Sequence, residues 1–299
     1  MRRVAGLHRL LVVTAAEDGR YEDVLKSLRA MQTVAGHAAD QPGLLGALVA
    51  QSVDVSTHAA IVRVATYFSD DEKGLALLTE FVASMKETPF MTGLRREVPL
   101  TLAVIDQLAS GEVKLSDVLG ESSGQGAAGT SVDKLLPFAD YHDSMRERYL
   151  RIMVGYADVW GDHAAVVKVE EALDAELEED TEDLATILSN MVMAVLLPMT
   201  SSTHYGELSA RVRARMTKIG LAAMEYRRAN GAWPTLEVAA QTAEVDPADP
   251  FGDRIHYLPS GDSLTMYSNG RDMADNGGRR REGPDSQYDS PIVTFRFDG

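Results

Sequence analysis

Hydrophobic residues recur at helical spacing through most of the first two thirds of the chain. Residues 21–35 carry Val24, Leu28 and Met31 on one face, three or four positions apart. The segment Ser69-Asp70-Asp71-Glu72 indicates an N-cap with acids in the first turn of another helix, which runs to about residue 85. Pro42, Pro89 and Pro99 are expected to mark breaks. No tetratricopeptide period recurs, so the pattern predicts irregular helical hairpins rather than a regular repeat array.

The pattern changes after residue 200. An apolar stripe of Leu208, Val212, Met216 and Ile219 predicts a helix over residues 207–230, closed by a cap at Asn230-Gly231. Short strands are expected at 254–258, 264–268 and 292–297, the first two joined by a turn at residues 261–262.

These patterns predict an α+β fold with two domains. A mainly α-helical N-terminal domain of irregular helical hairpins covers residues 1–200, with a flexible Gly/Ser-rich loop at about 120–131. Residues 201–299 then form a long helix and a small antiparallel β-sheet. The length of 299 residues agrees with two domains.

The net charge and the absence of cysteine exclude several classes of function. The chain has 45 acidic and 29 basic residues and a net charge of −16, which argues against a nucleic-acid binder. It has no cysteine, which excludes disulfides, thiol nucleophiles and thiolate metal sites. The acidic stretch at 170–183 is either a solvated helix end or a contact surface for a basic partner, and that partner could be the 211–218 face of the same chain.

No membrane span is predicted in this chain. The longest stretch without Asp, Glu, Lys or Arg is 184–206, and only residues 187–199 are densely apolar. Asn190 and Pro198 interrupt it, and a span needs about 20 mostly apolar residues. We therefore expect a buried core helix that stops near Pro198. The N-terminal apolar run contains His8 and Arg9, so a signal peptide fits poorly.

Histidine and acidic residues cluster in one part of the helical domain, around His142 and His163. Zinc hydrolases use two histidines one helical turn apart, and His142 has no such partner. Local ion pairs of Asp143 and Glu147 with neighbouring arginines are the favoured interpretation. The sequence identifies no catalytic residue, no cofactor-binding residue and no small-molecule ligand.

The C-terminal third resembles the globular domain of the major pseudopilin of type II secretion systems. The whole chain also looks like uncharacterised bacterial proteins in which a helical domain precedes such a module. The resemblance covers roughly residues 205–299. It rests on the following segments, in this order: Ala223–Tyr226, Asn230–Thr235, Asp249–Gly252 with Tyr257, and Tyr267–Asp272 with Gly277-Gly278.

This resemblance implies a calcium site in the acidic loop, because Ca²⁺ takes six to eight oxygen ligands. The matching positions are Ser268 and Asp272, with Asp285 and Asp289 placed like the later acids and Asp275 as a further candidate. Ca²⁺ is the one cofactor expected. The alternative is a Gly/Asp turn held by side-chain-to-backbone hydrogen bonds.

Three functional hypotheses follow. The favoured one is a non-catalytic interaction or assembly protein of the bacterial cell envelope, related to secretion or pilus-like components, which binds a protein partner or a second copy of itself. The second is a hydrolase-type enzyme with a site between the domains, using His142, His163 or His204. The third is a cytoplasmic helical adaptor. The resemblance favours the envelope or periplasm if an N-terminal anchor precedes the chain, and the cytoplasm otherwise.

Overall fold

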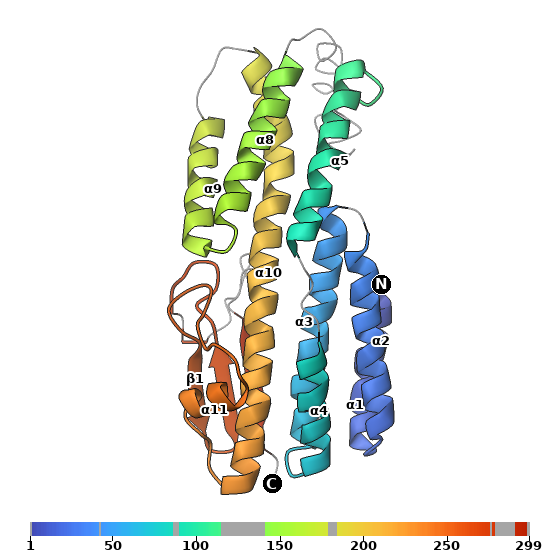
Figure 1. Cartoon of the computed structure of the whole chain (residues 1–299), viewed down its shortest axis with the longest axis vertical. Helices are drawn as coiled ribbons and strands as arrows, with labels where there is room; N and C mark the ends of the chain where they lie inside the picture. The colour runs from blue at the N-terminus through green and yellow to red at the C-terminus, as the bar shows by residue number, and fades with distance from the viewer. Residues whose placement is uncertain are drawn as a thin grey trace. The chain divides into compact units, whose positions relative to one another are not determined.

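The computed structural model describes residues 2–41, 43–85, 90–114, 141–178, 184–275, 277–278 and 291–297. Within these residues it has nine helices and three strands, which confirms the predicted α+β class (Figure 1). The loop expected at about 120–131 lies outside the described residues.

The chain divides into two compact units. Unit 1 comprises Met1–Gln41, Leu45–Phe90 and Tyr205–Gly299, and unit 2 comprises Pro42–Leu44 and Met91–His204. This division differs from the boundary expected at residue 200, because the first helices group with the C-terminal module and not with the middle of the chain.

Most elements belong to unit 1. They are α1 (Arg2–Glu17), α2 (Tyr21–Ala39), α3 (Leu44–Tyr67), α4 (Glu72–Ser84), the C-terminal half of α10 (Leu184–Asn230), α11 (Leu236–Thr242), and strands β1 (His256–Ser260), β2 (Ser263–Tyr267) and β3 (Ile292–Arg296). Unit 2 holds α5 (Phe90–Ser110), α8 (Tyr141–Val159), α9 (His163–Glu178) and the N-terminal half of α10.

One hydrophobic core joins the helices and the sheet of unit 1. The C-terminal half of α10 lies between α3 and α4 on one side and the sheet on the other (Figure 1). Its predicted apolar stripe is buried in this core with Leu78 of α4 and Phe295 of β3. Helix and sheet approach closely at Gly220, where an added Cβ would lie 1.9 Å from a ring carbon of Phe295. Only glycine therefore fits at this crossing.

The start of α4 is capped within the predicted segment 69–72, by Asp71. The Asp71 carboxylate accepts hydrogen bonds from the backbone N–H groups of Lys73 and Gly74, each at 3.1 Å. The Tyr21 hydroxyl of α2 donates to the same carboxylate, and this bond raises the pKa of the phenol. The cap therefore also ties α2 to α4.

The sheet is antiparallel in the order β1-β2-β3. Ser260 pairs with Ser263, so Gly261 and Asp262 form the predicted two-residue turn. Leu264 and Met266 of β2 and Val293 and Phe295 of β3 alternate onto the core face. At the other end of the module, Gly231 has a φ of 76° and closes α10, as the Asn-Gly pair predicts.

Two prolines lie inside helices that were expected to break there. Pro99 is within α5, and α10 continues past Pro198 to Asn230. The expected stop near Pro198 is therefore wrong. A proline removes one backbone hydrogen bond from a helix, and the neighbouring turns on both sides keep theirs.

Among the described residues, one helix is long and apolar enough to cross a membrane. It is α3, with a mean hydropathy of 1.3 over its most apolar 18-residue window, and half of that window is buried in the protein. Ile61 and Val64 of α3 are fully buried in the core of unit 1, which is typical of a core helix. The described residues thus give no clear membrane span.

Candidate functional site

The loop that carries the expected calcium ligands is organised by a buried carboxylate, that of Asp249. Its Oδ1 accepts hydrogen bonds from the Ser268 hydroxyl at 2.8 Å and the Phe251 N–H at 3.0 Å. Its Oδ2 accepts from the Asn269 N–H at 2.9 Å. Asp249 is 3% exposed, and these bonds satisfy it. The Asp-Pro-Phe-Gly segment thus joins the end of α11's loop to the end of β2.

The described calcium candidates already have partners within the loop. Ser268 is fully buried and donates to Asp249, while Asp272 accepts from the Ala274 N–H at 3.3 Å. Asp275 accepts from the Gly277 N–H at 2.8 Å and the Tyr267 hydroxyl at 3.0 Å, and these bonds lower its pKa.

These contacts are those of a Gly/Asp turn, and no three acidic or histidine side chains among the described residues form a metal-binding group. Asp285 and Asp289 lie outside the described residues, so calcium binding here stays a prediction.

Two of the three candidate catalytic histidines meet inside unit 2. His163 Nδ1 and His204 Nε2 are 3.3 Å apart, and their rings stack at 5.5 Å between centroids. Trp160 packs edge-on against His204 at 4.8 Å. Both histidines are buried, whereas His142 is half-buried near the start of α8. The pair provides two imidazoles in an aromatic setting, and the described residues add no acid that would complete a metal-binding group of three.

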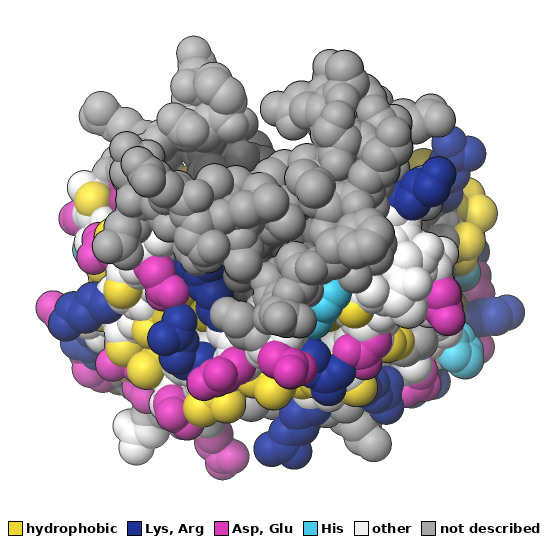
Figure 2. Space-filling model, turned by 90° about the horizontal axis from the view of Figure 1, so that it is seen from above, with side chains coloured by type: hydrophobic (Ala, Val, Ile, Leu, Met, Phe, Trp, Pro, Cys, Tyr) yellow, Lys and Arg dark blue, Asp and Glu magenta, His cyan; other side chains and the backbone are white. Residues whose placement is uncertain are grey.

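Part of the acidic stretch at 170–183 pairs within unit 2. Glu176 of α9 accepts from Arg148 at 3.1 Å and from Arg151 at 2.9 Å, both of α8. Arg211, in the basic segment considered as its partner, instead pairs with Glu207 one turn before it. Over the described part of the face in Figure 2, acidic and basic side chains lie next to each other, and neither sign forms a continuous field.

A groove of about 720 Å³ follows β1. It is lined by the chain that enters α11, the segment that enters β1, β1 itself and Asn269. Leu258 is 50% exposed, and Trp233 is half-buried beside the strand. The Tyr257 hydroxyl donates to the Pro234 carbonyl at 3.1 Å, and burial raises its pKa to about 12. The Tyr257–Pro234 hydrogen bond thus holds one side of the groove, and the exposed Leu258 makes the other side apolar.

The groove runs along a sheet edge that no described strand covers. In a hairpin with a two-residue turn, the residues that flank the turn form a hydrogen-bonded pair, and the next pair does not. Alternation therefore points the N–H and C=O of Tyr257, and the C=O of Pro259, away from β2. The Ile255 N–H bonds to the Pro247 carbonyl at 3.0 Å, which covers the start of the edge.

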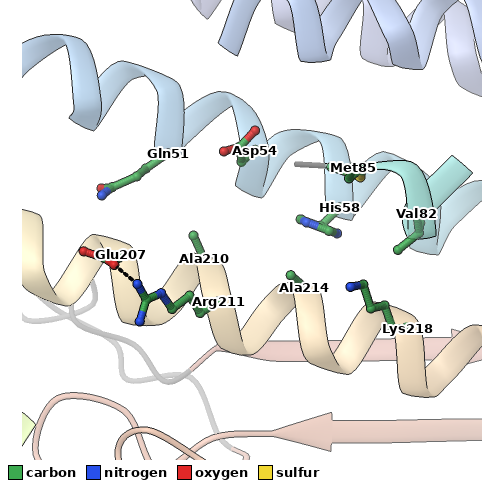
Figure 3. A pocket seen from close by; sticks show the side chains of 10 residues that line it. All are labelled: Gln51, Asp54, His58, Val82, Met85, Glu207, Ala210, Arg211, Ala214 and Lys218. Atoms are coloured by element: carbon green, nitrogen blue, oxygen red, sulfur yellow. Dashed lines mark ion pairs between the residues drawn. The ribbon is translucent and has the colours of Figure 1, made fainter. Parts of the chain in front are cut away.

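A second pocket lies within unit 1 between α3, α4 and α10, and has a volume of about 50 Å³ (Figure 3). The pocket exists because the α10 residues that face α3 here, Ala210 and Ala214, have small side chains. Gln51 and His58 point into it from α3, and each is only 6% exposed. Val82 and Met85 close one end.

His58 is held neutral in this pocket. Its pKa is lowered from 6.5 to about 4, first by burial and then by the positive charges of Lys218 and Arg213. At the other end, the buried Glu207 carboxylate pairs with Arg211. At one end of the pocket the neutral His58 lies near the positive charge of Lys218. At the other end the charges of Glu207 and Arg211 balance each other.

Comparisons of this chain with protein-family models, with curated proteins and with solved structures find no significant match. No pattern in the sequence predicted the α3–α10 pocket, because its residues share no motif and come from helices about 150 residues apart. Asp249 was visible only as part of a turn, although its place before Pro-Phe-Gly is typical of a side chain that bonds to nearby backbone.

Proposed function

We propose that the protein is a non-catalytic interaction or assembly protein that binds an extended segment of a partner protein in the groove along β1. The observation that carries this proposal is the combination of an open sheet edge with an apolar groove beside it. Extended peptides add to such edges through backbone hydrogen bonds and gain specificity from pockets for alternate side chains.

The chemistry of the edge limits how the partner binds. Tyr257 offers one donor and one acceptor, and Pro259 offers only an acceptor because it has no N–H. A long intermolecular sheet is therefore disfavoured, which protects the protein from edge-to-edge aggregation. Contacts of the partner's side chains with Leu258 and Trp233 would supply most of the affinity.

The bacterial cell envelope is the proposed setting, and secretion or pilus-like assemblies are the proposed context. Both rest on the pseudopilin resemblance of the C-terminal third. Under this proposal the partner is another protein of the assembly, or a second copy of this chain. A cytoplasmic adaptor would use the same groove, so the groove alone does not choose the compartment.

The hydrolase alternative is the weaker proposal. Its only support among the described residues is the contact between His163 and His204. Both imidazoles are buried, that of His204 against Trp160, and catalysis would also require access for a substrate.

Site-specific crosslinking tests the interaction proposal. A photoreactive phenylalanine analogue replaces Leu258 in the groove, or Leu150 of α8 as the control, which is also exposed at 39%. We expect a discrete adduct in native cells from position 258 and none from position 150. An adduct of twice the mass of the chain identifies a second copy, and any other is identified by mass spectrometry.

Purified components then confirm or overturn the result. Leu258→Asp should weaken binding of the identified partner about tenfold, the effect of losing one apolar anchor. Leu150→Asp should leave it unchanged. The absence of an adduct at position 258, or equal effects of the two substitutions, would contradict the proposal.

A further inference from the structure

From the pocket between α3 and α10 we infer that this chain binds a short hydroxycarboxylate, with its carboxylate at Lys218 and His58 and its hydroxyl group at Gln51. The site lies on the helices of unit 1 and is separate from the groove along β1. It does not depend on the proposed function.

Two buried polar atoms in the pocket lack partners among the described residues. They are Gln51 Oε1 and His58 Nδ1, on side chains that are both 94% buried. A buried polar atom without a hydrogen bond costs about 1–3 kcal/mol, so native proteins seldom keep one without a ligand or water. Both side chains point from α3 toward α10 across the space left by two alanines (Figure 3).

The Lys218 end is suited to a carboxylate. The ammonium group points toward His58 (Figure 3) and makes no hydrogen bond or ion pair with the described part of the chain. A neutral imidazole carries one N–H that it can donate. An ammonium group and an N–H directed at one space form a two-donor site for an anionic oxygen.

The Gln51 end is suited to a hydroxyl group. Gln51 Oε1 is an acceptor, so a ligand must present a donor there. A second carboxylate is disfavoured at this end, because Glu207 is buried beside it and already holds Arg211. Apolar contact with Ala210, Ala214 and Val82 fits the hydrocarbon between the two polar groups.

The size of the pocket limits the ligand. A water molecule needs at least about 10–15 Å³ of such space, so about 50 Å³ holds three or four waters in a row. A chain of three or four carbons is of that size. Nucleotides, sugars and lipids are too large to be enclosed in it.

The pocket is built by close approach of the two helices. At Gly206 an added Cβ would lie 2.5 Å from Gln51 Oε1. Glycine at this position lets Gln51 reach across to α10. An alanine here would push the amide aside, at the end of a flexible side chain, and so disturb the ligand site more than the fold.

Calorimetric titration of the full chain tests the inference with three probes: 3-hydroxybutyrate, butyrate and inorganic phosphate. We expect saturable binding of 3-hydroxybutyrate, and weaker binding of butyrate because it leaves Gln51 without a donor. Lys218→Met should weaken 3-hydroxybutyrate binding about tenfold or more, since one charge-assisted hydrogen bond is lost. Lys168→Met, which removes the same charge from the exposed surface of α9, is the matched control and should have no effect.

A measurement on the unmodified chain guards against misfolded variants. The His58 imidazole resonances should shift on addition of 3-hydroxybutyrate, and the pKa of His58 should rise because an anion stabilises the charged ring. Other charges that line the same pocket are Asp54 of α3 and Glu207, Arg211 and Lys218 of α10.

Four outcomes would overturn the inference. They are no saturable binding, a preference for phosphate, equal effects of Lys218→Met and Lys168→Met, or unmoved His58 resonances.

Discussion

His58 is a base that the fold keeps uncharged. It is buried on α3, and its pKa falls from 6.5 to about 4 because burial, Lys218 and Arg213 all disfavour the imidazolium ion. The unfolded chain therefore binds a proton at His58 that the folded chain does not, between about pH 6.5 and pH 4. Stability contributed by the neutral ring is complete above pH 6.5 and is lost as the pH falls toward 4.

This linkage predicts a measurable difference between the wild type and His58→Gln. The pKa difference corresponds to about 3 kcal/mol of unfolding free energy, lost by the wild type between pH 7 and pH 4. In His58→Gln the side chain at position 58 does not titrate, so the unfolding free energy of this variant should fall less between pH 7 and pH 4. Urea unfolding of both proteins at several pH values measures the difference. Parallel pH profiles would contradict the buried neutral imidazole.

Other single residues show which long-range contacts local patterns miss. Gly220 is one residue in a helical run, where local propensity favours alanine over glycine. Its necessity comes from Phe295, 75 positions later in the chain. The same is true of Gln51 and His58, whose roles depend on α10. Hydrophobic spacing predicts which face of a helix is buried, but not which partner helix it meets.

Elements whose ends are determined locally were predicted well. The cap at Asp71, the closure of α10 at Gly231 and the turn at Gly261-Asp262 each depend on residues within a few positions of one another. The prolines were predicted badly. Pro99 and Pro198 lie inside helices, because a helix can continue through a proline at the cost of one backbone hydrogen bond.

The β-hairpin and the loop after it depend on one carboxylate, that of Asp249. We expect Asp249→Asn to lower the unfolding free energy by about 2 kcal/mol, because an amide nitrogen would face a backbone or hydroxyl donor in a buried site. Asp246→Asn is the matched control. Asp246 is exposed and, among the described residues, bonds only to the Ala248 N–H at 3.0 Å, so its loss should cost less than about 0.5 kcal/mol. Equal losses for the two variants would show that Asp249 does not organise the module.

The core of unit 1 is made from segments far apart in the chain. Leu78 of α4 is buried in the same core as Val212 and Met216 of α10. The Thr79 hydroxyl donates to Glu225 at 2.7 Å, and Glu72 pairs with Arg228 at 3.1 Å. A division at residue 200 treats the C-terminal module as a domain with its own core. In the structure, the C-terminal half of α10 packs against both the sheet and the first four helices.

An independent C-terminal domain and a core shared with the first helices predict different behaviour for the isolated fragment 201–299. If residues 201–299 formed an independent domain, the fragment would unfold cooperatively on its own. Because one side of its long helix packs on α3 and α4, we expect the fragment to expose Val212 and Met216 and to aggregate or remain unfolded. Co-expression with residues 1–90 should restore a soluble complex with a cooperative urea transition by circular dichroism. A Leu78→Asp change in the 1–90 fragment should abolish that rescue, since it buries a charge in the shared core. A fragment 201–299 that melts cooperatively by itself would support the predicted boundary at residue 200.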